Sequence, residues 1–344
     1  MKTSNTIKLT SNCRKNQFLP LWVGIQFCVM MLAWSVMVSQ DQNNKSGDLL
    51  PKAIKKEGTF LIVLGTVQDA GSPHIACKKI CCAELYNTND FRRKVVSLGL
   101  LDTRNKKKYL LEATPDITYQ MKALKRFEHN DSKETPDGIF LTHAHIGHYT
   151  GLMYLGKEAM NADKVKVYAM PKMKHFLEQN GPWSQLISNH NILIHEITNQ
   201  KEVLLTTSLK VIPVRVPHRD EYSETVGYVI QGPKKSALFI PDIDKWEKWN
   251  LDITEEIKKV DYAFLDATFF DGKEINNRDI SQIPHPFIVE SMKKFEGMHI
   301  EERNKIIFIH FNHTNPVLNP ESAESKTVEK NGFRIARRND IFQL

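Results

Sequence analysis

Three histidines fall within six positions of this 344-residue chain, directly after an apolar run at 138–141. They are His143, His145 and His148. Neutral imidazole is the commonest protein ligand for zinc and similar ions. Residues two apart in an extended segment share a face, so His143 and His145 can contact one ion where a strand ends. His148 falls near the start of an expected helix with apolar positions from 152 to 160, and it approaches from another side. A polar surface loop is the less favoured interpretation, because this spacing seldom arises by chance.

Each of three later apolar runs ends directly before a side chain that can bind a metal: His218, Asp242 and His310. A side chain at a strand end is held by the sheet and still opens to a cleft. Three or four protein groups usually hold one ion, with carboxylates among them where hydrolysis is catalysed. The sequence therefore predicts a metal centre.

The order of these ligands, HxHxxH followed by His, Asp and His, resembles the metallo-β-lactamase fold superfamily from about residue 58 onward. The resemblance implies an α/β (α+β) fold, an αββα sandwich with the metals at one edge between the sheets. It implies that a first metal is held by His143, His145 and His218. It implies that a second metal is held by His148, Asp242 and His310, with Asp242 as the bridge.

One position departs from that family, whose motif carries an Asp directly before its third His. Here that position is Gly147. The second site is left with three protein ligands and one fewer negative charge, so a single metal is an open alternative. Asp244 could substitute, because an extended chain would place it on the same face as Asp242. An exposed acid at a strand end is the favoured interpretation of Asp244.

A second resemblance lies upstream, at 64–74 and in the cysteines that follow it, Cys77, Cys81 and Cys82. With the segments 111–117 and 311–316, it is similar to the pyrroloquinoline quinone biosynthesis protein B group. The upstream loop also resembles cyclic phosphodiesterases of phosphonate metabolism, whose three cysteines bind a structural zinc. Their fourth ligand is a His three residues past the last catalytic His, which implies His313. Three thiolates and one imidazole form a closed tetrahedral set.

The cysteine spacing departs from those relatives, since C-x-x-x-C-C replaces C-x-C-x-x-C. A disulfide with one free thiol and three reduced packing cysteines are the alternatives to a structural zinc. His74 is a spare ligand.

Further acids and histidines have weaker signals. The resemblance implies that His285 contacts substrate or donates a proton, so Asp242 and His285 are the predicted catalytic residues. Asp266 lines the cleft or caps a turn. Oxygens that could support His218 from behind are carried by Glu221, Ser223 and Thr225. Packing or surface positions are expected for the histidines without strand-end context: His129, His175, His190, His195 and His299.

The first forty residues differ in composition from the rest. Four basic residues precede an uncharged run at 18–39, and no acid occurs before Asp41. This pattern predicts a signal peptide or N-terminal membrane anchor at 1–40, a linker at 41–57 and one domain at 58–344. It predicts export, to the periplasm or anchored to the inner membrane.

Charge and cysteine usage separate the leader from the body. Of the net charge of +7, four positives belong to the leader, leaving +3 for the body, which argues against a nucleic-acid partner. Two of the five cysteines also lie in the leader, and the remaining three cannot form a complete disulfide framework.

Strands are expected where short apolar runs recur: 59–65, 95–101, 108–111, 165–169, 209–216, 225–231, 237–240, 262–265 and 305–310. Helices are expected at 173–179, 254–259 and 286–295. Sheets covered by helices on their outer faces follow from this alternation.

The preferred hypothesis is an exported metal-dependent hydrolase with zinc, one or two catalytic ions and a third structural one. Its metal-bound hydroxide would attack an ester, phosphodiester, lactone or amide bond of a small molecule. Iron or manganese are alternative metals, and iron would suit a redox enzyme related to quinone biosynthesis. A non-catalytic metal-binding or ligand-binding protein is the third alternative. The sequence does not determine the oligomeric state.

Overall fold

The structure is a computed structural model that describes residues 53–127, 133–275 and 282–344. The expected leader at 1–40 lies outside the described residues, as does His129. Within the described part, no helix is long and apolar enough to cross a membrane.

The first of two seven-stranded sheets has the order β14-β1-β2-β3-β4-β5-β6. Its strands are β1 (Thr59–Gly65), β2 (Ser97–Asp102), β3 (Lys107–Leu111), β4 (Gly138–Phe140), β5 (Val165–Ala169), β6 (Ile192–Glu196) and β14 (Ile341–Gln343). Pairing is antiparallel from β14 to β3 and parallel from β3 to β6.

The second sheet has the order β13-β12-β11-β10-β9-β8-β7. Its strands are β7 (Val203–Thr206), β8 (Leu209–Arg215), β9 (Val226–Gln231), β10 (Ser236–Ile240), β11 (Tyr262–Asp266), β12 (Ile306–Ile309) and β13 (Arg334–Ile335). Pairing is antiparallel from β7 to β10 and parallel from β10 to β13. Both sheets therefore carry a parallel half.

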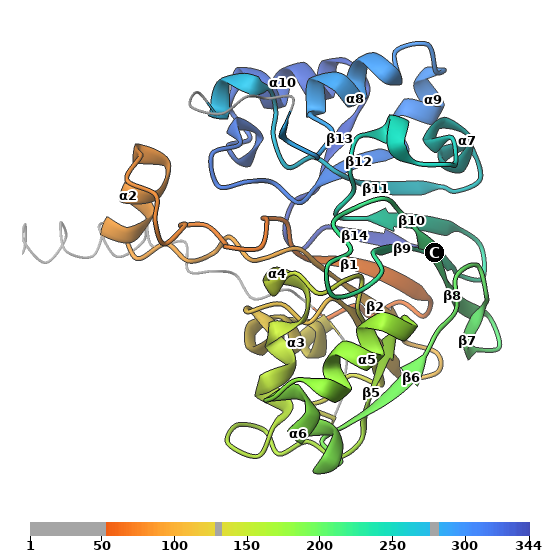
Figure 1. Cartoon of the computed structure of the whole chain (residues 1–344). Helices are drawn as coiled ribbons and strands as arrows, with labels where there is room; N and C mark the ends of the chain where they lie inside the picture. Colours follow the sequence, from red (N-terminus) through yellow and green to blue (C-terminus); the bar gives the residue numbers. More distant parts are fainter. Residues whose placement is uncertain (1–52, 128–132, 276–281) are drawn as a thin grey trace, which may run out of the picture. The chain divides into compact units, whose positions relative to one another are not determined.

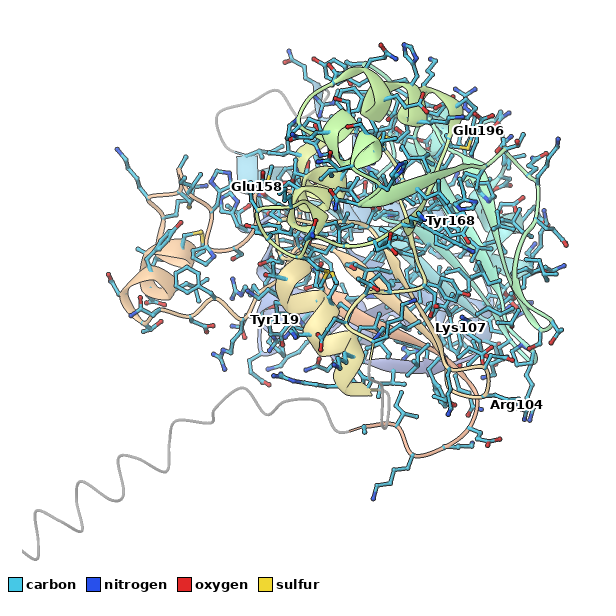
Figure 2. The ribbon with its side chains drawn as sticks, turned by 90° about the horizontal axis from the view of Figure 1, so that it is seen from below. Arg104, Lys107, Tyr119, Glu158, Tyr168 and Glu196 are labelled. Atoms are coloured by element: carbon cyan, nitrogen blue, oxygen red, sulfur yellow. The ribbon has the colours of Figure 1, made fainter. Side chains whose placement is uncertain are left out.

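Helices cover the outer face of each sheet, as Figure 1 shows. Beside the first sheet lie α3 (Ile117–Phe127), α5 (Pro171–Gln179) and α6 (Trp183–Ser188). Beside the second lie α7 (Ile253–Lys258), α8 (Ile288–Lys294), α9 (Ile300–Arg303) and α10 (Ala323–Lys330). Helix α2 (Ile80–Asn87) stands apart from both sheets in Figure 1 and again in Figure 2. The predicted αββα sandwich is confirmed.

Strand β1 illustrates why the layers form, because all seven of its residues are buried. Side chains alternate along a strand, so Leu61 and Val63 enter the core between the sheets, which also holds Phe264. Ile62 and Leu64 enter the separate core under the helices of the first sheet. Burial of each such side chain contributes about 1.5–3 kcal/mol, which explains why β1 has no polar face.

An aromatic cluster in the inter-sheet core holds the end of β4. Phe140 stacks on Tyr168 of β5, labelled in Figure 2, with ring centroids 4.3 Å apart. Tyr228 of β9 contacts Phe140 edge-on at 5.5 Å and donates a hydrogen bond to the Leu141 carbonyl. The second sheet therefore fixes the backbone two residues before the first motif histidine.

All nine expected strands and all three expected helices are present, each end within two residues of its predicted position. The helix expected from His148 onward is wrong in length. A single turn, α4 (Ile146–Tyr149), passes into a 3₁₀ helix at Thr150–Leu155, and Met153 and Met160 are exposed rather than part of an apolar stripe.

Candidate metal centre

Asp242 lies at the middle of the site, two residues past the end of β10, and its side chain is 3% exposed. Its Oδ2 lies 3.4 Å from His143 Nε2, 3.3 Å from His218 Nε2 and 3.8 Å from His145 Nδ1. These four residues offer donor atoms within 4.8 Å of one another. The ligands predicted for a first metal therefore converge, with Asp242 beside them.

A second donor set shares Asp242 with the first. It adds His148, His310 and a residue that sequence reasoning missed, Asp69. Asp242 Oδ2 lies 3.9 Å from His148 Nε2. Asp69 Oδ1 lies 2.8 Å from His148 Nε2 and 3.6 Å from His310 Nε2. The predicted ligands of both metals therefore gather around the Asp242 carboxylate.

The donor atoms fit a zinc centre. His143 Nε2 and His310 Nε2 are buried, and among the described residues they have no hydrogen-bond partner. Such buried polar atoms are costly unless another group, here a cation, satisfies them. Burial opposes the charge of Asp242, but His218 and His285 hold its pKa well below the ordinary value, so the carboxylate is ionised and ready to ligate.

A polar group fixes the ring of each of three candidate ligands from behind. Thr142 Oγ1 lies 2.9 Å from His143 Nδ1, and Thr268 Oγ1 lies 2.9 Å from His310 Nδ1. Asp244 Oδ1 lies 3.1 Å from His218 Nδ1. Because these contacts occupy Nδ1, they leave Nε2 to face the metal.

Asp244 therefore does not act as a substitute ligand for the second site, although an extended chain would have allowed it to do so. It belongs to neither donor set and stands behind His218. With its side chain 14% exposed, it is not an exposed strand-end acid either.

The residues expected behind His218 act elsewhere. Ser223 Oγ accepts from Ala144 N, and so supports the motif segment. Thr225 donates to Asp220, and a Glu221 oxygen lies 3.6 Å from His145 Nε2. Sequence order placed them near His218, but the chain turns away after that residue.

Glu112 is a second residue that the sequence did not single out as functional. It follows β3, is fully buried, and has a left-handed backbone with φ of 79°. Its Oε1 lies 3.2 Å from His148 Nδ1, and Oε2 accepts from Thr142 N. The ligand His310 also has positive φ, 68°. Such conformations cost about 1–3 kcal/mol and cluster at functional sites.

His285 and Asp266 form a third cluster with Asp242. His285 Nδ1 lies 2.9 Å from Asp266 Oδ2 and 3.2 Å from Asp242 Oδ1. Asp266 is fully buried and also accepts from Thr268 and Ile243 N. The structure therefore brings His285 to the Asp242 carboxylate and gives Asp266 a position behind His285.

The three cysteines form a separate cluster at helix α2. Cys77, Cys81 and Cys82 are free, lie within 4.8 Å of one another, and place two sulfurs 3.8 Å apart. Burial and the neighbouring thiols raise the pKa of Cys81 to about 12. Grouped sulfurs of this kind are what a cation would stabilise as thiolates.

The predicted fourth ligand, His313, is not within the donor set of the cysteines. Its ring stacks on His74 with centroids 4.4 Å apart, and its Nδ1 is buried without a hydrogen-bond partner among the described residues. His74 in turn contacts Cys82 through its backbone N–H, at 3.2 Å from the sulfur. Both candidate histidines therefore lie beside the cluster.

Of the remaining histidines, His195 packs against Tyr168 with its ring tilted and the centroids 5.4 Å apart, in keeping with a packing position. The other three, His175, His190 and His299, also belong to none of the donor sets found among the described residues.

Known proteins of the same organisation extend these observations. "Coenzyme PQQ synthesis protein B" of Methylorubrum extorquens (strain PA1) is 23% identical over 302 residues, covering 80% of this chain and 97% of the relative. The protein of that description from Gluconobacter oxydans is 24% identical, covering 83% and 98%.

Among solved structures, Zn(2+)-bound PqqB from Methylobacterium extorquens superposes with a TM-score of 0.69 at 21% identity, over 83% of this chain and all of the other. A diphosphatase from the PhnP family gives 0.57 at 21% identity, over 83% and 97%. The model of the beta-lactamase superfamily domain matches residues 107–311, which include every predicted catalytic-metal ligand. This chain belongs to the beta-lactamase superfamily.

Proposed function

We propose that this protein is a metal-dependent hydrolase that uses zinc. The observation that carries the proposal is the pair of donor sets that share Asp242. Bound zinc lowers the pKa of its water from about 16 to about 7 and so supplies hydroxide at neutral pH. His143, His145 and His218 would hold the ion that does this, and His148, Asp242 and His310 would hold a second one.

His285 is the residue placed to move a proton. Its Nδ1 lies between the Asp242 and Asp266 carboxylates, so that nitrogen carries hydrogen and Nε2 is left to face substrate. The side chain is 10% exposed, which keeps a path to the bound molecule. An imidazole within hydrogen-bond distance of the proton that it transfers typically raises the reaction rate by about 10²–10⁴-fold.

A small molecule with an ester, phosphodiester, lactone or amide bond is the proposed substrate class. Two metals about 3.5–4 Å apart clamp the attacking and leaving oxygens of a phosphodiester, and a carboxylate shared by the two donor sets favours such a pair. Among proteins of this fold, the diphosphatase of the PhnP family supports phosphate chemistry.

A metal-dependent redox reaction is the second candidate. The relatives described as coenzyme PQQ synthesis protein B match over four fifths of this chain, and histidine-carboxylate sets with open positions also suit iron. Oxygen consumption during turnover with iron would support it.

Export is part of the proposal. The basic residues before the uncharged run at 18–39 support a signal peptide or an anchor in the inner membrane. Only this N-terminal segment would then contact the membrane.

The test is metal content with hydrolysis. The full-length protein is purified as wild type and as His143→Ala, metals are measured per chain, and activity is assayed on ester, lactone, amide and phosphodiester panels. Bound zinc with hydrolysis that His143→Ala abolishes is expected. Metal binding without turnover on any panel would refute the hydrolase and favour a binding protein.

A further inference from the structure

We propose that Asp69 supplies, from the loop after β1, the metal-binding carboxylate that relatives place directly before the third motif histidine. Gly147 stands at that motif position because Asp69 fills the space there. This inference rests on the metal centre of the proposed function. It restores a carboxylate to the second site from a distant part of the sequence.

The space beside Gly147 carries the first argument. A Cβ added to Gly147 would lie 2.4 Å from Asp69 Cα, 2.6 Å from its Oδ1 and 2.8 Å from its Cβ. Real Cβ contacts do not come this close, so any side chain at 147 would displace Asp69. Because the nearest atom is backbone, a smaller side chain at 69 would not remove the clash. The two positions therefore exclude each other.

The donor geometry is the second argument. Two ligands bound about 2.0–2.2 Å from one zinc ion are roughly 2.8–3.8 Å apart at angles of about 90–120°. Asp69 Oδ1 lies 2.8 Å from His148 Nε2 and 3.6 Å from His310 Nε2. Both distances fall in that range, so an ion can be shared by Asp69 and each histidine, and the donor atoms of all three residues lie within 4.8 Å of one another.

The backbone of the loop is the third argument, because it ties Asp69 to His310. Gln68 N donates to Phe311 O at 2.8 Å, and Phe311 N donates to Thr66 O at 2.8 Å. Val67 and Phe311 form a parallel bridge that links the first sheet to the residue after the ligand. Asp69 is therefore held by the same backbone that places His310, which gives a ligand the rigidity that metal binding needs.

The alternative role for Asp69 is a hydrogen-bond acceptor for His148 alone. The 2.8 Å distance would allow it, with Glu112 on the opposite nitrogen. That role does not explain why Asp69 Oδ1 also approaches His310 Nε2, which has no hydrogen-bond partner among the described residues. A shared ion explains both contacts.

The experiment measures zinc per chain in full-length wild type, Asp69→Asn, Gly147→Ala and the double variant. Asparagine keeps the shape of aspartate and removes its charge, and Asp90→Asn is a matched control in a carboxylate outside the donor sets. Each single variant is expected to lose one zinc equivalent, or to bind it at least tenfold more weakly. The double variant is expected to lose no more than that.

Two outcomes would overturn the inference. Wild-type zinc content and affinity in Asp69→Asn would show that Asp69 is no ligand. A Gly147→Ala protein that folds, by its circular dichroism, and keeps both ions would show that the two positions do not exclude each other. If Asp69→Asn loses its ion while wild type hydrolyses nothing, the ligand assignment stands and the hydrolase proposal fails.

Discussion

The buried glutamate behind His148 gives a prediction whose size follows from the structure. Glu112 Oε1 lies 3.2 Å from His148 Nδ1, which must carry hydrogen when Nε2 binds metal. In Glu112→Gln, the amide oxygen can keep the bond from Thr142 N, and the amide nitrogen then turns a donor toward a donor. The attraction between the carboxylate of Glu112 and His148 Nδ1–H is thereby replaced by a weak repulsion between two N–H groups.

The expected magnitude is bounded from two sides. Full unit charges at this distance and an effective dielectric of about 20 would interact by about 5 kcal/mol. A metal-bound imidazole carries only part of such a charge, and loss of a partner behind a ligand typically costs about 10–100-fold in metal affinity. We therefore expect second-site zinc binding to weaken by about 1.4–2.8 kcal/mol.

A chelator competition titration on the two-zinc protein measures this change. First-site affinity should stay unchanged, because Glu112 contacts none of that site's histidines. Glu224→Gln is the matched control: Glu224 is also buried, but its carboxylate accepts from Lys172 N at the start of α5. Second-site affinity in Glu112→Gln within about twofold of wild type would refute the role of this carboxylate behind the ligand.

Three further predictions concern the core, a buried acid and the cysteines. Phe264→Ala should lower the free energy of unfolding by about 3–5 kcal/mol in urea titrations, because it leaves a cavity in the inter-sheet core. Burial raises the pKa of Glu274 to about 7. When the pKa of an acid is higher in the folded than in the unfolded protein, the folded state is stabilised by the bound proton. That stabilisation is lost as the pH rises from the unfolded-state pKa through the folded-state pKa. Stability should fall by about 2–3 kcal/mol from pH ~4.5 to ~7, and Glu274→Gln should flatten that slope. Cys81→Ser should remove one zinc equivalent and leave hydrolysis intact, whereas unchanged zinc content would argue against a structural ion.

The ligands that sequence reasoning found share one property. His218, Asp242 and His310 each follow a strand rich in apolar residues, and the end of such a strand is recognisable from its apolar run. The three-histidine motif needed only short-range spacing. Both signals are local, so they survive without knowledge of the fold.

What sequence reasoning missed is not local. Asp69 lies 79 residues before His148, in the segment 64–74, where the resemblance pointed to the loop but spacing alone could not bring it to the site. The resemblance singled out the segment 111–117, which contains Glu112, but it gave no role for that residue. The positive φ of Glu112 is visible only in three dimensions. The prediction that Asp244 could replace the missing ligand is wrong because the chain does not stay extended after β10.

The sheet pairing explains why the metal centre forms where it does. Each sheet has a parallel half, and the carboxyl ends of parallel strands open at one edge. The motif histidines follow β4 in one sheet, and Asp242 and His310 follow β10 and β12 in the other. The Val67–Phe311 bridge joins these halves directly beside Asp69 and His310. Each proposed metal ion therefore binds side chains from both sheets, so zinc bound only by the folded state should stabilise the packing of one sheet on the other.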